Sequence, residues 1–371
     1  MRLALVHDYL YVYGGAERTL EEAHRVWPGA PVHTLLYVRE ALPPSFKEMD
    51  VRPTWVDRLP GRLRWQRAYA MLQPLAFGAL RVRDADTLLS FASFGAKAVP
   101  APPGGRHLCY CFTPPRFLWG PASGIDRGRL PAPARRASAV LERYLRRWDL
   151  GAARRVSRFI TQSRYVAGRI RRVYGREAEV IPPPVDVQRF AAATPRDGGY
   201  FLIVSRFEAY KRIDLAIQAC RAVGAPLRIV GAGVDEARLR EVAGDTPHVR
   251  FLGPLPDREV VELMAGCRAF LYPGEEDFGL TAVEAQAAGR PVIAFAQGGA
   301  LETVIPGLTG ALFDEPAAEA LAEAIAAFRP ERYDPRVARR NAARFAPEAF
   351  RERLRQAVET TVETTVEAGA A

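Results

Sequence analysis

A strand–helix–strand unit between residues 269 and 295 constrains the fold of this chain more than any other segment. Two apolar runs, Ala269–Tyr272 and Val292–Phe295, have the length and composition of buried strands. The helix expected between them ends where Gly289 is followed by Pro291, because glycine commonly ends a helix and proline cannot continue one. Two buried strands joined by a crossover helix lie parallel. We therefore expect a parallel α/β sheet.

The same alternation runs through the second half of the chain and, less regularly, through the first. The expected strands of the second half are Tyr200–Val204, Leu227–Val230 and Val249–Leu252. Its expected helices are Arg212–Val223, Val234–Ala243, Asp257–Met264 and Leu301–Ile305. The expected strands of the first half are Leu3–His7, Thr87–Phe91, His107–Phe112 and Phe159–Gln162. This pattern predicts a Rossmann-like, doubly wound sheet in each half.

The length of 371 residues predicts two domains, because a single ordinary core does not grow to this size. The run Ile181-Pro-Pro-Pro184 is the natural linker, since consecutive prolines continue neither a helix nor a sheet. We expect one domain at 1–184 and a second at 185–345, facing each other across a cleft. A helix in 346–371 is expected to cross back to the first domain.

Two carboxylates flank the start of the helix in the strand–helix–strand unit. Glu276 lies in the loop before this helix and Glu284 lies within it. The free N–H groups at a helix N-terminus favour an anion, so nearby carboxylates need another partner, such as sugar hydroxyls. A ligand with phosphates in its middle and a sugar at each end fits this pattern, which favours a sugar nucleotide. Simple compensation of the helix dipole by the acidic loop is the alternative.

Two cations follow the first strand of the second half. Arg206 and Lys211 lie at the carboxyl end of the strand that ends at Val204, which is where open α/β sheets bind their ligands. The planar fork of arginine and the point charge of lysine together suit a diphosphate. The alternative is that both are solvated loop cations.

These motifs in combination resemble glycosyltransferase family 4, whose members are retaining enzymes of the GT-B fold that use nucleotide sugars. The resemblance covers nearly the whole chain and is closest to bacterial mannosyltransferases that use GDP-mannose. Its motifs are Gly14-Gly15-Ala16-Glu17, Ser205-Arg206 with Lys211, Gly231-Ala-Gly233, Phe251-Leu-Gly253, and Glu276-x7-Glu284 enclosing Phe278-Gly279-Leu280.

The resemblance implies a role for each residue of the second domain's site. Arg206 and Lys211 would hold the diphosphate and stabilise the leaving group, and Glu276 would bind hydroxyls of the donor sugar; these three are the expected catalytic residues. Glu284 would bind the ribose. The remaining residues expected to contact the donor are Gly14, Gly15, Gly231, Gly253, Leu255, Asp277, Phe278, Gly279 and Leu280.

The first domain would then bind the acceptor, and here the sequence departs from the family. Many relatives place a histidine that faces the donor sugar where this chain has Phe112. The acceptor-side candidates are His7, Asp8, Thr113 and Arg116.

We expect neither a metal nor a cofactor beyond the donor, because protein cations would meet the charge of the leaving group. Asp84-Ala-Asp86 has the form of a metal-binding Asp-x-Asp motif, but it directly precedes a strand and is interpreted as a turn.

Charge is distributed unevenly along the chain. Residues 1–185 contain 30 Lys and Arg against 15 Asp and Glu, whereas the remainder contains 22 against 27. The arginine-rich first half predicts an anionic partner. An anionic membrane surface suits a lipid-linked or glycan acceptor and a cytoplasmic, peripheral protein. Nucleic acid is not expected, because no basic-aromatic recognition module is present. Arginine enrichment from a GC-rich genome is the alternative explanation.

The function expected from these observations is transfer of a hexose from a nucleotide sugar to a glycan or lipid-linked acceptor in cell-envelope polysaccharide or glycolipid synthesis. Mannose from GDP-mannose is the first choice of donor, and a UDP-hexose is the second. Two alternatives remain open. One is a catalytically inactive, membrane-associated adaptor that binds nucleotide sugars, and the other is a sugar-nucleotide epimerase on the same fold.

Overall fold

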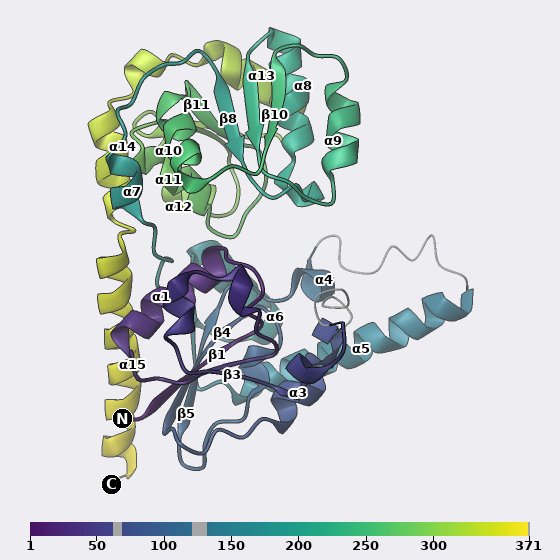
Figure 1. Ribbon diagram of the computed structural model, residues 1–371, viewed down its shortest axis with the longest axis vertical. Coiled ribbons are helices and arrows are strands. Elements are labelled where there is room, and N and C mark those ends of the chain that lie inside the picture. The colour runs from purple at the N-terminus through teal and green to yellow at the C-terminus, as the bar shows by residue number, and fades with distance from the viewer. Residues whose placement is uncertain (62–68, 121–131, 370–371) are drawn as a thin grey trace. The chain divides into compact units, whose positions relative to one another are not determined.

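The computed structural model describes residues 1–61, 69–120 and 132–369, and the chain divides into two compact units (Figure 1). Unit 1 comprises Met1–Pro182 together with Phe350–Ala371, and unit 2 comprises Pro183–Ala349. The first boundary falls within the expected proline linker. The last helix begins in unit 2 and continues into unit 1.

Unit 1 is built on a seven-stranded sheet whose strands all run parallel in the order β3-β2-β1-β4-β5-β6-β7. The strands are β1 (Leu3–His7), β2 (Val32–Thr34), β3 (Val51–Pro53), β4 (Thr87–Ala92), β5 (Arg106–Cys111), β6 (Arg158–Thr161) and β7 (Ala178–Val180). The α-helices are α1 (Gly15–Val26), α3 (Gln73–Ala79), α4 (Arg116–Trp119), α5 (Ala132–Arg155), α6 (Arg164–Tyr174) and most of α15 (Pro347–Gly369).

Unit 2 is built on a six-stranded parallel sheet of order β10-β9-β8-β11-β12-β13. The strands are β8 (Phe201–Val204), β9 (Leu227–Val230), β10 (Val249–Gly253), β11 (Ala269–Tyr272), β12 (Val292–Phe295) and β13 (Gly310–Phe313). The α-helices are α7 (Val187–Ala191), α8 (Ile213–Val223), α9 (Glu236–Ala243), α10 (Asp257–Gly266), α11 (Leu280–Ala287), α12 (Ala300–Thr303), α13 (Ala318–Ala327) and α14 (Pro335–Ala343).

Short 3-10 helices connect several of these elements. They are Arg39–Ala41, Pro44–Lys47, Trp55–Arg58, Ala70–Leu72, Ala96–Ala98, Ala209–Lys211 and Pro330–Arg332. Among the described residues, no helix is both long and apolar enough to cross a membrane.

The last helix, α15, is part of the core of unit 1. Phe350 and Leu354 are buried with Leu5 and Tyr110, which belong to the central strands β1 and β5. The rings of Tyr110 and Phe350 meet edge to face at 5.9 Å. Helix α15 therefore buries apolar surface that its own unit needs for stability.

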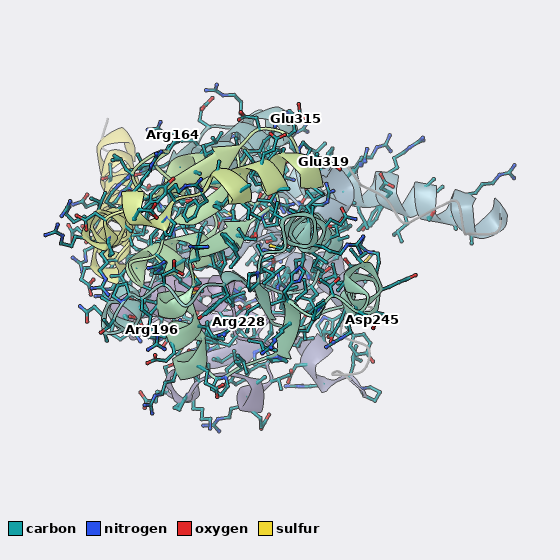
Figure 2. The ribbon with its side chains drawn as sticks, turned by 90° about the horizontal axis from the view of Figure 1, so that it is seen from above. Arg164, Arg196, Arg228, Asp245, Glu315 and Glu319 are labelled. Carbon is teal, nitrogen blue, oxygen red and sulfur yellow. The ribbon has the colours of Figure 1, made fainter. Side chains whose placement is uncertain are left out.

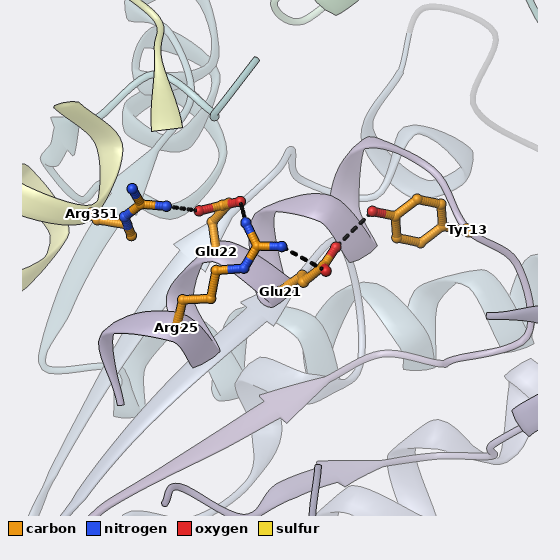
Figure 3. Close-up of polar contacts among 5 residues, drawn as sticks. All are labelled: Tyr13, Glu21, Glu22, Arg25 and Arg351. Carbon is orange, nitrogen blue, oxygen red and sulfur yellow. Dashed lines mark hydrogen bonds and ion pairs between the residues drawn. The ribbon is translucent and has the colours of Figure 1, made fainter. Parts of the chain in front are cut away.

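A chain of polar contacts joins α15 to α1 (Figure 3). Arg351 of α15 pairs with Glu22 of α1, and Glu22 also pairs with Arg25. Arg25 reaches Glu21 at 3.1 Å, and Glu21 accepts a hydrogen bond of 2.6 Å from the hydroxyl of Tyr13. These contacts hold the helix that begins at Gly15 in a fixed place in unit 1.

A buried ion pair anchors the long helix α5. Asp149 of α5 and Lys97 are both fully buried, and Lys97 Nζ lies 2.6 Å from Asp149 Oδ1. Asp149 Oδ2 accepts hydrogen bonds of 2.9 Å from Trp119 Nε1 of α4 and from the hydroxyl of Tyr174 of α6. Because an unpaired buried charge is costly, this cluster fixes α4, α5 and α6 against one another.

The expected fold class is confirmed, since both halves contain parallel α/β sheets. Strands β11 and β12 agree with the predicted Ala269–Tyr272 and Val292–Phe295 at both ends. The helix predicted at Leu301–Ile305 is wrong in its bounds, because α12 begins at Ala300 and ends at Thr303. Its last predicted residues lie directly before Pro306, and a residue that precedes proline disfavours the helical conformation.

Candidate active site

The expected donor residues lie along one edge of the sheet of unit 2. Ser205 follows β8, Gly231 follows β9, Gly253 ends β10, and the loop 273–279 follows β11. All these strands are parallel, so their carboxyl ends meet at the same edge. The structure thus brings together segments that are up to about 70 residues apart in the sequence.

Glycine allows the loops after β8 and β9 to pack backbone against backbone. Gly231 has a φ of 129°, and a Cβ atom there would lie 1.9 Å from the carbonyl oxygen of Ser205. At Gly233 a Cβ atom would lie 2.3 Å from the oxygen of Phe207. The N–H of Gly231 also donates to the oxygen of Gly253 at 2.9 Å. These contacts leave no room for a larger residue.

A second glycine pair holds the acidic loop after β11. The N–H of Gly299 donates to the oxygen of Glu276 at 2.8 Å. A Cβ atom on Gly298 would lie 2.3 Å from this same oxygen, and one on Gly299 would lie 2.3 Å from Cα of Phe278. The Gly298-Gly299 turn therefore fixes the backbone that carries Glu276, a role that the sequence analysis did not assign to it.

Helix α11 begins at this loop, and no side chain of its N-cap residue caps it. Gly279 is the N-cap residue, has a φ of 99°, and provides no side chain to cap the helix. Its first turn contains no acidic residue. The backbone N–H groups and the partial positive charge of a helix N-terminus favour an anion such as phosphate.

The cation Lys211 and the carboxylate of Glu276 form an ion pair. Their side chains are 14% and 18% exposed, so the pair is largely shielded from solvent. Both residues line a small pocket together with Ser205, Tyr272 and Thr281. The pair joins the loop after β8 to the loop after β11, 65 residues further along the chain.

Tyr272 brings a buried phenol to the same pocket. Its ring is 3% exposed, and among the described residues its oxygen has no hydrogen-bond partner of good geometry. Burial, and then the negative charge of Glu276, raises the pKa of the Tyr272 phenol well above its usual value. The group is therefore a neutral hydrogen-bond donor beside Glu276. The sequence analysis missed it, because Tyr272 ends an apolar strand and reads as a core residue.

Two other charged donor candidates of unit 2, Arg206 and Glu284, have contrasting surroundings. The guanidinium of Arg206 is exposed, and no carboxylate of the described residues pairs with it. Glu284 is almost buried, with its Oε1 3.7 Å from Nη2 of Arg189. Arg189 of α7 also pairs with Asp257 at the start of α10. Arg189 thus orients Glu284, and the sequence analysis did not identify it.

The remaining donor candidates of unit 2 frame the same edge. Leu255 packs against the apolar core, and Gly253 has a φ of 70° with open space where a Cβ would stand. Asp277 and Phe278 precede the N-cap Gly279, and Phe278 is buried against Phe345 at 5.3 Å. Leu280 is the first residue of α11.

In unit 1, the expected residues form a separate group at the carboxyl end of β1. Gly14 is the N-cap residue of α1 and Gly15 its first residue, and the N–H of Gly14 donates to Glu17 Oε2 at 2.9 Å. Asp8 is 6% exposed, and its carboxylate accepts hydrogen bonds from the N–H groups of Ser93, Phe94 and Ala96 at 2.7 to 3.0 Å. Asp8 therefore shapes the loop after β4.

His7 lies beside the residue that departs from the family pattern. The ring of Phe112 is 6.5 Å from that of His7 and 5.4 Å from that of Tyr110. His7 Nδ1 is 2.9 Å from the oxygen of Tyr9, while its Nε2 is buried with no hydrogen-bond partner among the described residues. His7 therefore lies next to Phe112 at this end of the sheet, and the side-chain amide of Gln162 donates to the backbone oxygen of Phe112 at 2.6 Å.

Two further acceptor candidates and the Asp-x-Asp segment have distinct positions. Thr113 is buried and Arg116 half-buried at the start of α4.

The carboxylates of Asp84 and Asp86 each pair with an arginine, Asp84 with Arg52 at 2.6 Å and Asp86 with Arg2 at 2.8 Å. Within the described ranges, no group of three or more His, Cys, Asp and Glu residues is placed to hold a metal.

Comparison with known proteins places these features in a family. The family model described as Glycosyltransferase Family 4 matches residues 13–189, and the one described as Glycosyl transferases group 1 matches residues 185–345. The two matches together extend over most of the chain and over both sheets. The chain belongs to the family 4 glycosyltransferases, as the resemblance of its motifs indicates.

Curated relatives within this family have differing activities. The chain is 34% identical over 173 residues to the GDP-mannose-dependent monoacylated alpha-(1-6)-phosphatidylinositol monomannoside mannosyltransferase of Corynebacterium glutamicum, covering 39% of this chain and 45% of that protein. It is 31% identical over 165 residues to a D-inositol 3-phosphate glycosyltransferase of Frankia alni, covering 36% and 40%. It is 34% identical over 223 residues to a glycogen synthase of Mycobacterium tuberculosis, covering 55% and 52%. The chain thus spans about half the length of the relatives it matches.

Solved structures with the same fold cover nearly the whole chain. Sucrose-phosphate synthase from Thermosynechococcus elongatus aligns with a TM-score of 0.75 at 18% identity, over 98% of this chain and all of the other. Anabaena Alr3699/HepE, solved in complex with UDP and glucose, aligns with a TM-score of 0.69 at 19% identity, over 97% of this chain and 99% of the other. At these identities the likeness establishes the fold, which is that of GT-B glycosyltransferases.

The packing of Gly231 predicts an unequal effect of two glycine substitutions. Both Gly231 and Gly224 have positive φ, but only at Gly231 would a Cβ atom collide with the backbone. Gly224→Ala is expected to cost about 1–2 kcal/mol through left-handed strain alone. Gly231→Ala should cost more and should also weaken nucleotide binding, because Ser205 must move. Urea unfolding and nucleotide titration of both variants measure this, and equal losses would contradict the packing argument.

Proposed function

We propose that this chain is a retaining hexosyltransferase that transfers a hexose, mannose in the first instance, from a nucleoside-diphosphate sugar to a glycan or lipid-linked acceptor. The observation that carries the proposal is the grouping of Lys211 and Glu276 with the N-terminus of α11 at one edge of the sheet. This edge offers positive charge for a diphosphate and a carboxylate for sugar hydroxyls within one small space.

In this proposal the diphosphate lies at the N-terminus of α11, and Arg206 and Lys211 neutralise its charge. The bond between the anomeric carbon and the phosphate oxygen breaks while the acceptor oxygen attacks from the same face. The departing phosphate oxygen takes the proton of the acceptor hydroxyl. The two cations and the helix N-terminus supply the charge that this leaving group needs, so the step is proposed to run without a metal ion.

When the donor binds, both residues of the ion pair between Lys211 and Glu276 change partners. Lys211 leaves Glu276 for the more highly charged diphosphate, and the carboxylate then accepts hydrogen bonds from donor-sugar hydroxyls. The neutral phenol of Tyr272 is close enough to support the released carboxylate as a hydrogen-bond donor. Glu284, oriented by Arg189, is proposed to bind the ribose.

The choice of donor rests on the relatives. Mannosyltransferases that use GDP-mannose are among them, while the solved Anabaena neighbour contains UDP. We therefore expect GDP and GDP-mannose to raise the melting temperature more than UDP, ADP or their hexose conjugates, in buffer containing a metal chelator. A preference for UDP would indicate a UDP-hexose as the donor and would leave the assignment as a transferase unchanged. No shift with any nucleotide would contradict the assigned donor site.

Substitution of Glu276 tests the chemistry of the site. Glu276→Ala is expected to lower turnover about 100-fold or more, which corresponds to about 2.7 kcal/mol of transition-state stabilisation. The neighbouring Glu275→Ala is the matched control and should change turnover only a few-fold. Release of nucleoside diphosphate is measured with and without acceptor, with circular dichroism to verify the fold.

Three outcomes would count against this role. A near-native rate for Glu276→Ala would remove Glu276 from the mechanism. Nucleotide binding by the wild type without any release of nucleoside diphosphate would favour the adaptor. Conversion of the donor to an epimeric sugar nucleotide would favour the epimerase.

The proposal includes an anionic membrane surface as the partner of unit 1, and α5 is the element that supports it. This helix extends well beyond the sheet of its own unit (Figure 1). Its exposed side includes Val140, Leu141 and Tyr144, whose exposed fractions are 70%, 42% and 53%. These residues are spaced to lie on one face of the helix, so they form an apolar stripe that none of the described residues of unit 1 covers.

A line of arginines borders this apolar stripe. Arg136, Arg143, Arg147 and Arg154 are exposed and follow one another at intervals of seven, four and seven residues. At 3.6 residues per turn these intervals place all four along one line of the helix. An apolar stripe beside a cationic line is the pattern of helices that lie on anionic bilayers, where each cation near the surface contributes roughly 1 kcal/mol.

Vesicle co-sedimentation tests this partner. The double variant Val140→Ser/Tyr144→Ser is expected to lower binding to phosphatidylglycerol-containing vesicles at least 10-fold. Arg143→Gln/Arg147→Gln should lower binding to anionic vesicles but not to neutral phosphatidylcholine vesicles. Val223→Ser, at an exposed apolar position of unit 2, is the control. Unchanged binding in both double variants would contradict the membrane assignment.

A further inference from the structure

Two arginines stand side by side at the opposite end of the unit 2 sheet from the candidate active site. Arg228 of β9 and Arg250 of β10 are partners in the register of these parallel strands, so their side chains leave the same face of the sheet. Neighbouring like charges on a sheet are destabilising. Within the described part of the chain, no carboxylate pairs with either guanidinium.

Three other arginines of unit 2 are paired with carboxylates. Arg268 lies 3.2 Å from Asp197, Arg238 lies 2.6 Å from Asp235, and Arg240 lies 2.8 Å from Glu236. The charges of Arg228 and Arg250 are therefore available to solvent or to a bound anion.

The two arginines line an open hollow of about 380 Å³. Its walls include Tyr200, Pro226, Pro247 and His248, which lie at or just before the starts of β8, β9 and β10. A hollow of this size accommodates a molecule as large as a phosphorylated hexose.

Tyr200 and His248, two of these wall residues, differ in their contacts. The guanidinium of Arg228 lies 3.7 Å from the centre of the Tyr200 ring, which holds the charge in place by a cation–π contact. The Tyr200 hydroxyl donates to the oxygen of Leu263 at 2.9 Å, so this ring is itself fixed. His248 Nε2 is shielded from solvent and has no hydrogen-bond partner within the described residues.

The surroundings of Tyr200 are also cationic. Burial raises the pKa of the Tyr200 phenol, and the positive charges of Arg228 and Arg196 oppose this rise. Arg196 and Arg228 lie on the same side of unit 2 (Figure 2). An anion at this hollow therefore meets several positive charges, of which Arg228 is preorganised.

We propose that this hollow is a second ligand site, separate from the donor site, which binds the phosphoryl group of a phosphate monoester of about the size of a sugar. The forks of Arg228 and Arg250 hold the phosphate oxygens, since guanidinium groups match phosphate geometry. Tyr200 and the two prolines border the space for the rest of the molecule. The site lies at the amino ends of β8 to β10, whereas the donor residues lie at their carboxyl ends.

Calorimetric titration of the full chain with glucose 6-phosphate tests this site. The donor site is first saturated with whichever nucleotide the protein binds. Glucose 6-phosphate that binds only at the donor site would then have to compete with this nucleotide. Glucose 6-phosphate and inorganic phosphate are expected to bind, whereas glucose and potassium chloride of equal ionic strength are not. In Arg228→Gln/Arg250→Gln, the affinity for glucose 6-phosphate should fall at least 10-fold while nucleotide affinity stays within twofold.

Arg221→Gln/Arg332→Gln removes the same charge from exposed positions outside the hollow and should bind like the wild type. Three results would each overturn the proposal. They are equal affinity in both double variants, competition by the nucleotide, and no binding of any phosphate probe. Vesicles containing phosphatidic acid distinguish the source of the phosphoryl group. Binding to these vesicles that is lost only in Arg228→Gln/Arg250→Gln assigns the site to a lipid headgroup instead of a soluble ester.

Discussion

The common direction of the six strands in unit 2 is the constraint on which the candidate active site depends. Because all the strands are parallel, every loop that follows a strand emerges at one edge, and Lys211 meets Glu276 across 65 residues of sequence. The glycine contacts then fix these loops at backbone distance. Gly231 packs against Ser205, and Gly299 donates to the oxygen of Glu276. A sheet with one reversed strand would separate these groups.

Electrostatics makes this edge suitable for a sugar nucleotide. The start of α11 and Lys211 favour an anion, and Lys211 balances the charge of Glu276 beside them. In the proposed function, an incoming diphosphate competes for the same cation and thereby releases the carboxylate for hydroxyl groups. Binding of the phosphates by Lys211 would then be coupled to binding of the sugar by Glu276, because the two residues form one ion pair.

Much of the fold could be predicted from the sequence, because its signals are local. Glycine, proline and apolar runs mark β11 and β12 at both ends. The three-residue strands β2, β3 and β7 were not predicted, since so few residues show no periodicity and pairing with neighbouring strands defines them. Motifs selected the residues that are proposed to bind the donor. The partners Tyr272 and Arg189 were missed, because only the tertiary fold brings a core tyrosine and a distant arginine to Glu276 and Glu284.

Hydrogen exchange of the backbone amides, with and without bound nucleotide, determines whether this edge of unit 2 is the donor site. If it is, exchange should slow at residues 279–283, where α11 begins, and at residues 205–211 after β8, because these N–H groups and loops would contact the diphosphate. Exchange at residues 247–250, at the other end of the sheet, should not change. Bound nucleotide that leaves the start of α11 unprotected, with protection confined to other segments, would contradict the assignment of this edge as the donor site.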